Sequence, residues 1–239
     1  QYVKDYAAYY DACRHADSPA IALQCDATDR AAVRRMLDEV VIAYGGIDEL
    51  VVTAGLFPTP GADGKTSDAD FLRAMQVNVL APAVLVEEAA TTMCAQKLAC
   101  STVVTTSVNA VVAKKGSSAY DASKAAANHL VRSLAVTVAP FVRVNAVAPA
   151  TVIEGSTMFP RPRVIASLKK YAIPFEESMT DAQLVECLGR FYAERTLLKT
   201  TITPRDQAAA IRFLAGPESS RTTGQVLHVD GGLADAFVR

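Results

Sequence analysis

Short runs of β-branched residues alternate with longer amphipathic stretches along this chain, and the alternation limits the possible folds more than any other feature. The longer stretches have helical spacing, as between Arg30 and Tyr44, where Thr28 or Asp29 can cap the start and Gly45 can end the helix. Alternation of this kind predicts an α/β fold with a doubly wound parallel sheet. The short runs predict strands buried on both faces: Ala20–Leu23, Glu49–Thr53, Thr102–Thr106, Val142–Val147 and Val226–Val229.

The length of 239 residues suits a single domain over residues 1–239, because no Pro/Gly/Ser-rich linker divides the chain. Two regions interrupt the alternation. Residues 150–203 contain two helical patterns and no strand, and they are too long for an ordinary connection, so we predict an insert that covers the substrate. Near the start, Val3–His15 predicts a helix rather than a strand followed by a glycine turn.

The charge balance argues against some classes of partner. With 24 basic and 25 acidic residues, the net charge of -1 gives no overall field to gather nucleic acid or an anionic membrane. No apolar run reaches the roughly 18 residues of a membrane span, and the start lacks the order of a signal peptide, so we predict a cytoplasmic protein. The five cysteines show no metal-ligand spacing with the three histidines, which indicates reduced thiols and no metal site.

The motif Tyr120-Asp-Ala-Ser-Lys124 places a phenol and an ammonium group on one face of a predicted helix. A phenol has an ordinary pKa of about 10, and a neighbouring cation lowers it by favouring the phenolate. We therefore expect Lys124 to make Tyr120 a useful acid and base near neutral pH. The bare spacing is a weak signal, since an exposed tyrosine and lysine on a helix give the same pattern.

Three further features are candidates for a binding site: two lie at the ends of predicted strands, and one is an asparagine inside a predicted helix. Ser107 follows an apolar strand, and the carboxyl ends of parallel strands are the usual ligand side of such a sheet. Thr53-Ala54-Gly55 ends another strand in small residues that allow a ribose to approach the backbone. Asn78 lies inside a helical stretch, where an asparagine is costly unless it makes specific contacts.

In their order and spacing, these features resemble the short-chain dehydrogenase/reductase family from about Ala20 to the C-terminus. The resemblance implies a Rossmann-type fold and a catalytic tetrad of Asn78, Ser107, Tyr120 and Lys124. Tyr120 would donate or accept the proton, and Lys124 would lower its pKa while binding the nicotinamide ribose. Ser107 would orient the reacting carbonyl or alcohol, and Asn78 would hold a water in the proton relay. A purely structural Asn78 is the alternative.

The same resemblance implies the contacts of a nicotinamide cofactor, NAD or NADP. Asp26, followed by Ala27, matches the acidic residue that contacts the adenine, although a plain helix cap also explains it. Thr53, Ala54 and Gly55 match the family's N-A-G segment, with Thr53 in place of asparagine. The remaining implied contacts are Tyr120 and Lys124 at the ribose and Pro149, Ala150 and Val152 at the carboxamide, with Ala150 in place of glycine.

The glycine-rich T-G-x-x-x-G-x-G loop of the family is missing from the sequence. In the family, roughly forty residues of strand, glycine turn, helix and second strand precede the segment that matches Ala20–Asp29. The fold is therefore expected to lack its first strand-helix-strand unit. Because that unit holds the pyrophosphate and selects between NAD and NADP, the preference is not readable. The alternatives are a cofactor-free remnant with a binding or structural role, and an epimerase or dehydratase on the same fold.

A narrower resemblance involves segments 104–117, 148–160, 191–197 and 229–239, which are similar to the C-terminal dehydrogenase domain of bifunctional rhamnulose-phosphate aldolase/short-chain dehydrogenase proteins. It implies an aldolase domain earlier in the parent protein and a small hydroxyaldehyde such as lactaldehyde as the substrate. The long helices that follow Phe71 and Tyr120 resemble the family's subunit interfaces, so we expect a homodimer or homotetramer.

Charged side chains around the insert allow weaker predictions. Arg161, Arg163, Lys169 and Lys170 would attract a phosphorylated or carboxylate substrate, although a solvated helix face is the simpler explanation. Glu154 lies where it would contact substrate hydroxyls.

Overall fold

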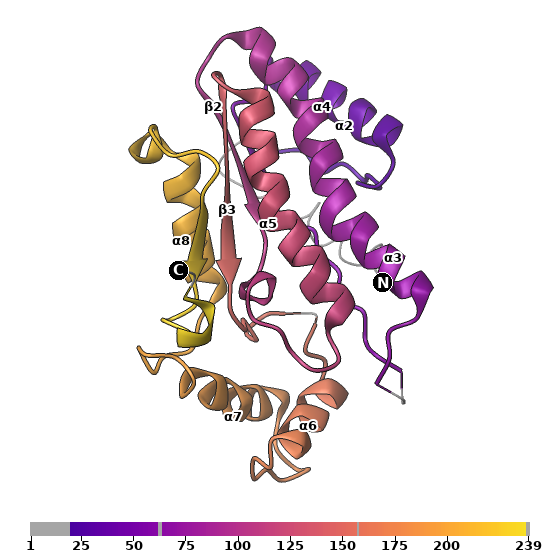
Figure 1. Ribbon diagram of the computed structural model, residues 1–239, viewed down its shortest axis with the longest axis vertical. Helices are drawn as coiled ribbons and strands as arrows, with labels where there is room; N and C mark the ends of the chain where they lie inside the picture. The colour runs from indigo at the N-terminus through magenta and orange to yellow at the C-terminus, as the bar shows by residue number, and fades with distance from the viewer. Residues whose placement is uncertain (1–19, 62–63, 157, 238–239) are drawn as a thin grey trace.

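The structure, a computed structural model, describes residues 20–61, 64–156 and 158–237. In these ranges four strands form one parallel sheet in the order β1-β2-β3-β4 (Figure 1). The predicted parallel α/β fold class is confirmed. The strands are β1 (Glu49–Val52), β2 (Cys100–Thr105), β3 (Val142–Pro149) and β4 (Val226–Val229).

Strand β2 shows why these valine-rich runs become strands. It pairs with β1 on one side and β3 on the other, and Val103 and Val104 are at most 2% exposed. Because successive side chains point to opposite faces, Val104 joins the core beneath helices α4 (Ala81–Gln96) and α5 (Ser118–Val138). Val103 packs instead beneath α8 (Pro204–Ala215) on the other face. Helices therefore cover both faces of the sheet, as Figure 1 shows.

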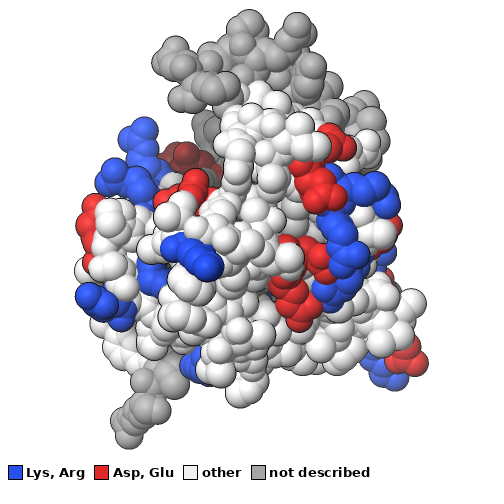
Figure 2. All heavy atoms as spheres, turned by 90° about the horizontal axis from the view of Figure 1, so that it is seen from above, with Lys and Arg blue, Asp and Glu red and all other residues white. Residues whose placement is uncertain are grey.

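Helix α2 spans Arg30–Tyr44 with the predicted bounds, and Asp29 rather than Thr28 caps it, accepting the Ala31 N–H at 2.9 Å. Its outer face carries ion pairs to α4, since Arg30 and Arg34 contact Glu87 and Glu88 at 2.7–2.9 Å. Figure 2 shows positive and negative side chains next to one another on the face seen from above, in keeping with the balanced composition.

One continuous helical run joins α3 (Asp68–Met75), the π-helical turn η1 (Gln76–Leu80) and α4. By length and composition alone it is apolar enough to cross a membrane. Its contacts give it a different role, because α4 packs against β1, β2 and β3, against α5, and through charged pairs against α2. We interpret it as a core helix of the domain.

The predicted strand at Ala20–Leu23 is wrong, because this segment is irregular in the structure. A strand needs a neighbour that takes up its backbone hydrogen bonds, and β1 pairs only with β2. Within the described ranges no strand lies on the other side of β1, so the segment has no ladder to join. The helix predicted at Val3–His15 lies outside the described residues.

The region after β3 forms two helices, α6 (Arg161–Lys170) and α7 (Asp181–Ala193), which Figure 1 shows beyond the carboxyl ends of the strands. They have their own small core, in which Val164, Leu168, Leu184 and Leu188 are at most 1% exposed. The short helices η2 (Val108–Ala110), η3 (Pro217–Ser219) and η4 (Ala234–Ala236) complete the described secondary structure.

The end of this two-helix region is tied to the segment that follows β4. The N–H groups of Leu197 and Leu198 donate to the carbonyls of Gly232 and Gly231, both at 3.0 Å. Both glycines have positive φ, and a Cβ at Gly231 would lie 3.2 Å from Thr196. The close approach therefore depends on glycine at these two positions.

Candidate active site

The four residues of the predicted tetrad come from three places that meet at the start of α5. Asn78 lies in η1, Ser107 caps η2 just after β2, and Tyr120 and Lys124 occupy the first turns of α5. Asn78 donates to Ser123 Oγ of α5 at 2.9 Å, and Ser107 forms a side-chain hydrogen bond with Tyr120 of α5. This brings them to the carboxyl edge of the sheet, where open α/β folds bind ligands.

Lys124 is the most buried charge of the group, with 4% exposure. Its Nζ donates to the carbonyl of Thr105 at 3.0 Å. Burial lowers its pKa to about 8. An ammonium group has three N–H donors, and the described residues provide this one hydrogen-bond acceptor. The remaining donors lie beside Gly55, where an added Cβ would be 3.5 Å from Nζ.

Tyr120 behaves differently from the prediction. Burial raises its pKa, a hydrogen bond with Ser107 lowers it, and the net shift is upward. The expected lowering by Lys124 is absent because the ammonium points to the Thr105 carbonyl and lies 5.7 Å from the Tyr120 ring centroid. The contact with Ser107 nevertheless pairs the two hydroxyls that would face a substrate oxygen. Phe57 packs against the phenol ring with a centroid distance of 4.9 Å.

Asn78 holds the end of β1 to α5. Its side chain accepts the Leu56 N–H at 2.8 Å and donates to the Leu56 carbonyl at 2.8 Å and to Ser123 Oγ at 2.9 Å. The π-helical turn around it adds a residue to the helix, a feature frequent at functional sites. Asn78 thus has a structural role, and its part in a proton relay stays a prediction.

The segments predicted to contact the cofactor end neighbouring strands. Thr53, Ala54 and Gly55 are exposed after β1, and Pro149, Ala150 and Val152 are half-buried at or after the end of β3. The free N–H donors of Lys124 beside Gly55 suit the hydroxyls of a ribose, so the described residues fit the nicotinamide-ribose half of the cofactor. They offer no glycine-rich loop for its pyrophosphate.

Asp26 and Ala27 lie just before α2. Asp26 Oδ1 accepts the N–H and the hydroxyl of Thr28 at 2.9 and 2.7 Å, which forms a turn and lowers the pKa of Asp26. The cap of α2 is Asp29, so the simple capping explanation for Asp26 is wrong. Among the described residues no hydrogen bond joins Asp26 to the tetrad, and an adenine contact stays a prediction.

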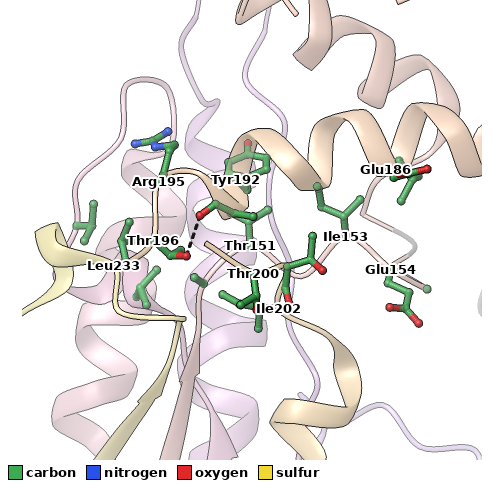
Figure 3. A pocket seen from close by; sticks show the side chains of 18 of the residues that line it. Thr151, Ile153, Glu154, Glu186, Tyr192, Arg195, Thr196, Thr200, Ile202 and Leu233 are labelled. Atoms are coloured by element: carbon green, nitrogen blue, oxygen red, sulfur yellow. Dashed lines mark hydrogen bonds between the residues drawn. The ribbon is translucent and has the colours of Figure 1, made fainter. Parts of the chain in front are cut away.

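A cavity of about 520 Å³ is lined largely by residues from region 150–203, and none of the four tetrad residues lines it. Its walls are mostly apolar, with polar groups at intervals (Figure 3). Val108, the neighbour of Ser107, and Ala150 connect it to the predicted site. Much of the wall was missed from the sequence: Lys114, Val185, Gly189, Tyr192, Arg195 and Leu233.

In the sequence, Gly189 is the feature that could have pointed to this wall, because it interrupts a helical pattern. A glycine inside a helical pattern costs about 1 kcal/mol relative to alanine and therefore indicates a close approach. In the structure a Cβ at Gly189 would lie 3.3 Å from Thr201 Cγ2, and both residues line the cavity.

Comparison with known proteins identifies the family. A family model described as enoyl-(acyl carrier protein) reductase matches residues 5–234. Short-chain dehydrogenase reductase 3a of Arabidopsis thaliana is 31% identical over 211 residues, which cover 87% of this chain and 74% of the relative. The chain belongs to the short-chain dehydrogenase/reductase family.

Two other similar proteins widen this view of the family. The uncharacterized oxidoreductase YuxG of Bacillus subtilis (strain 168) is 34% identical over 221 residues, which cover 92% of this chain but only 30% of YuxG. The ligand-free structure of Thermoplasma acidophilum aldohexose dehydrogenase aligns with a TM-score of 0.75 and 28% identity, covering 91% of this chain and 80% of that one.

Proposed function

We propose that this chain is the catalytic domain of an NAD- or NADP-dependent oxidoreductase that acts on a small alcohol, aldehyde or sugar-derived carbonyl. The observation that carries the proposal is the meeting of Ser107, Tyr120 and buried Lys124 at the carboxyl edge of the sheet. The cavity of about 520 Å³ is lined by Val108, which follows Ser107, and by Ala150. Membership in the short-chain dehydrogenase/reductase family supports the reaction type.

When bound, a nicotinamide cofactor would supply or accept the hydride at the substrate carbon. Ser107 donates a hydrogen bond to the substrate oxygen and fixes its position beside the phenol. Tyr120 delivers the proton to that oxygen during reduction or removes it during oxidation. Lys124, with a pKa of about 8, is largely charged at neutral pH and donates to the cofactor ribose.

A sugar-derived substrate is favoured over a purely apolar one. Thr151, Thr200 and Glu154 bring hydroxyl and carboxylate groups to a largely apolar cavity (Figure 3), and such groups pair with substrate hydroxyls. The similarity to aldohexose dehydrogenase points the same way. Lactaldehyde is one of the small hydroxyaldehydes that this reasoning includes. Region 150–203 would be the cover that closes over it.

A second candidate is a cofactor-free remnant of the same fold with a binding role. One experiment separates the two. The purified protein is titrated with NADH and with NADPH while cofactor fluorescence is followed, its intact mass is measured, and turnover is assayed with hydroxyaldehydes. Saturable binding with turnover that Tyr120→Phe abolishes supports the oxidoreductase, whereas no binding of either cofactor supports the remnant.

We further propose a cytoplasmic homodimer or homotetramer whose parent protein carries an aldolase domain. The match to only 30% of YuxG supports a longer parent. Leu72, Leu80 and Val136 are exposed on the α3–α4 run and α5, where the family resemblance predicts subunit contacts. The described cysteines are free thiols, as in reducing compartments. Sedimentation equilibrium of the purified protein tests the oligomeric state.

A further inference from the structure

Two cations at the cavity lack a carboxylate partner. Lys114, in the loop between η2 and α5, and Arg195, just after α7, both line the cavity. In the described part of the chain neither forms an ion pair, whereas Arg161, Arg190 and Lys199 nearby each pair with a carboxylate. Figure 3 shows Arg195 beside Tyr192 on one side of the pocket, and its guanidinium lies 5.9 Å from the ring centroid of Phe191.

The backbone around Lys114 is held in place, although its ammonium group is left unpaired. The carboxylate of Asp121 acts to raise the pKa of Lys114, but other donors already occupy it. It accepts Asn109 Nδ2 at 2.7 Å, the backbone N–H of Lys114 at 2.9 Å and Ser117 Oγ at 2.8 Å. Because Asp121 follows Tyr120 directly, these bonds fix Lys114 close to the predicted proton donor.

The two cations also act on each other. Loss of solvation lowers the pKa of Lys114, and Arg195 and Lys170 lower it further, while Tyr171 and Asp121 act in the opposite direction. Lys114 and Arg195 are both exposed, and an anionic ligand between them would reduce their mutual repulsion.

The opposite side of the cavity has the opposite charge. Glu154 and Glu186 line it there, away from Arg195 in Figure 3, and Glu186 also lies 3.7 Å from the guanidinium of Arg190. Asp181 also lines the cavity, but it pairs with Arg161 at 2.6 Å. A substrate with one anionic end would therefore bind in one orientation, with that end toward Lys114 and Arg195 and its hydroxyls toward the carboxylates.

The four basic residues suggested by the sequence are engaged elsewhere. Arg161 pairs with Asp181, and the Arg163 guanidinium lies over the rings of Phe57 and Phe159. Lys169 and Lys170 lie over Phe175 and Tyr171. None of the four lines the cavity, so the candidate anion contacts move to Lys114 and Arg195.

We infer that the substrate carries a phosphate ester, which binds between Lys114 and Arg195 while its carbonyl or alcohol reaches Ser107 and Tyr120. The inference rests on the proposed function and narrows its substrate class to phosphorylated polyols, aldoses or ketoses. A phosphomonoester has a charge close to -2 at neutral pH, which matches two unpaired cations better than the single charge of a carboxylate. Arginine also suits the geometry of phosphate oxygens.

The test measures binding separately from turnover. The dissociation constants of glycerol 3-phosphate and glucitol 6-phosphate are determined by phosphorus NMR titration, with glycerol, glucitol and glycerate as competitors. We expect Lys114→Met and Arg195→Met each to weaken phosphate-ester binding about tenfold, the usual size for one charged hydrogen bond. Lys115→Met and Arg221→Met, which remove charges that do not line the cavity, are the matched controls.

The outcomes separate this inference from the proposed function. It is overturned if neither phosphate ester binds, if the two control variants weaken binding as much as the cavity variants, or if glycerate binds more tightly than glycerol 3-phosphate. Turnover of uncharged hydroxyaldehydes without phosphate binding would leave the oxidoreductase standing and remove the phosphate subsite. Charge-dependent phosphate binding without cofactor binding would leave the phosphate subsite standing and remove the oxidoreductase. Circular dichroism confirms that each variant is folded.

Discussion

The floor of the site and its wall are held together in different ways. The floor consists of the ends of β1 and β2 and the start of α5, where Asn78 and Lys124 are nearly fully buried and bonded to backbone carbonyls. The wall is lined largely by α7, which shares a separate apolar core with α6, and α6 adds cation–aromatic contacts. The difference suggests that the floor sets the reaction and the wall sets the substrate.

The largest expected effect lies in the floor. Tyr120→Phe removes the proposed proton donor without changing the ring that packs against Phe57. We expect kcat to fall about a thousandfold, within the usual range for a general acid or base, with an unchanged thermal midpoint. Steady-state kinetics measures this, and Tyr44→Phe is the control. A loss below tenfold would mean that Tyr120 is not the proton donor.

The second effect concerns the buried Lys124. Its pKa falls from 10.5 to about 8 in the folded chain, so between these values the unfolded state binds more protons. The free energy of unfolding should therefore rise as pH increases through this window, by about 3 kcal/mol in total. Below pH 8 the cost of burying the ammonium is fully present.

Urea unfolding of the wild type and Lys124→Met across this window isolates the contribution. We expect the variant to lose this rise and to be the more stable protein at neutral pH, although it should be inactive. Lys115→Met, an exposed neighbour of the cavity loop, should keep the wild-type profile. Identical profiles for the wild type and Lys124→Met would show that Lys124 is not buried as a charge.

A smaller effect is expected where the floor joins the end of β1. Asn78→Ala removes three hydrogen bonds and leaves the N–H and carbonyl of Leu56 unpaired. We expect a loss of about 2 kcal/mol in the free energy of unfolding, measured by urea denaturation. Gln225→Ala, a partly exposed side chain on the other side of the sheet, should change it little. If Asn78→Ala lowered kcat with no loss of stability, a relay role would be favoured over a structural one.

The smallest effect tests whether floor and wall are coupled. The Arg163 guanidinium lies 4.7 Å from the ring centroid of Phe57 in the floor and 5.3 Å from that of Phe159 in the wall. Arg163→Leu should remove about 1 kcal/mol of the interaction that holds α6 against the floor. It should raise KM a few-fold with kcat nearly unchanged. A matching fall in kcat would contradict the division between reaction and substrate binding.

The floor was largely predictable because its signals are local. Each signal can be recognised within a few residues of the chain. The Tyr120–Lys124 spacing places two groups on one helix face, and the small residues after β1 lie at the usual ligand side of the sheet. Asn78 lies inside a helical stretch that disfavours asparagine. The helix over Arg30–Tyr44 was predictable for the same reason, since its cap and its stop adjoin it in sequence.

The wall was not predictable because its partners are distant in sequence. Lys114 and Arg195 belong to two loops that only the packing of α7 brings to one cavity. The pKa of Tyr120 depends on burial, which spacing does not reveal. The irregular Ala20–Leu23 shows the same limit, because a strand pattern says nothing about whether a pairing neighbour is present.

The two hydrogen bonds from Leu197 and Leu198 to Gly232 and Gly231 connect the wall to the chain beyond β4. Any motion that swings α7 away from the cavity has to break them, so these two amides should exchange with solvent deuterium each time the wall opens. Their exchange rates would follow wall opening directly, while the amides of β2, buried in the sheet, would respond only to unfolding of the whole domain.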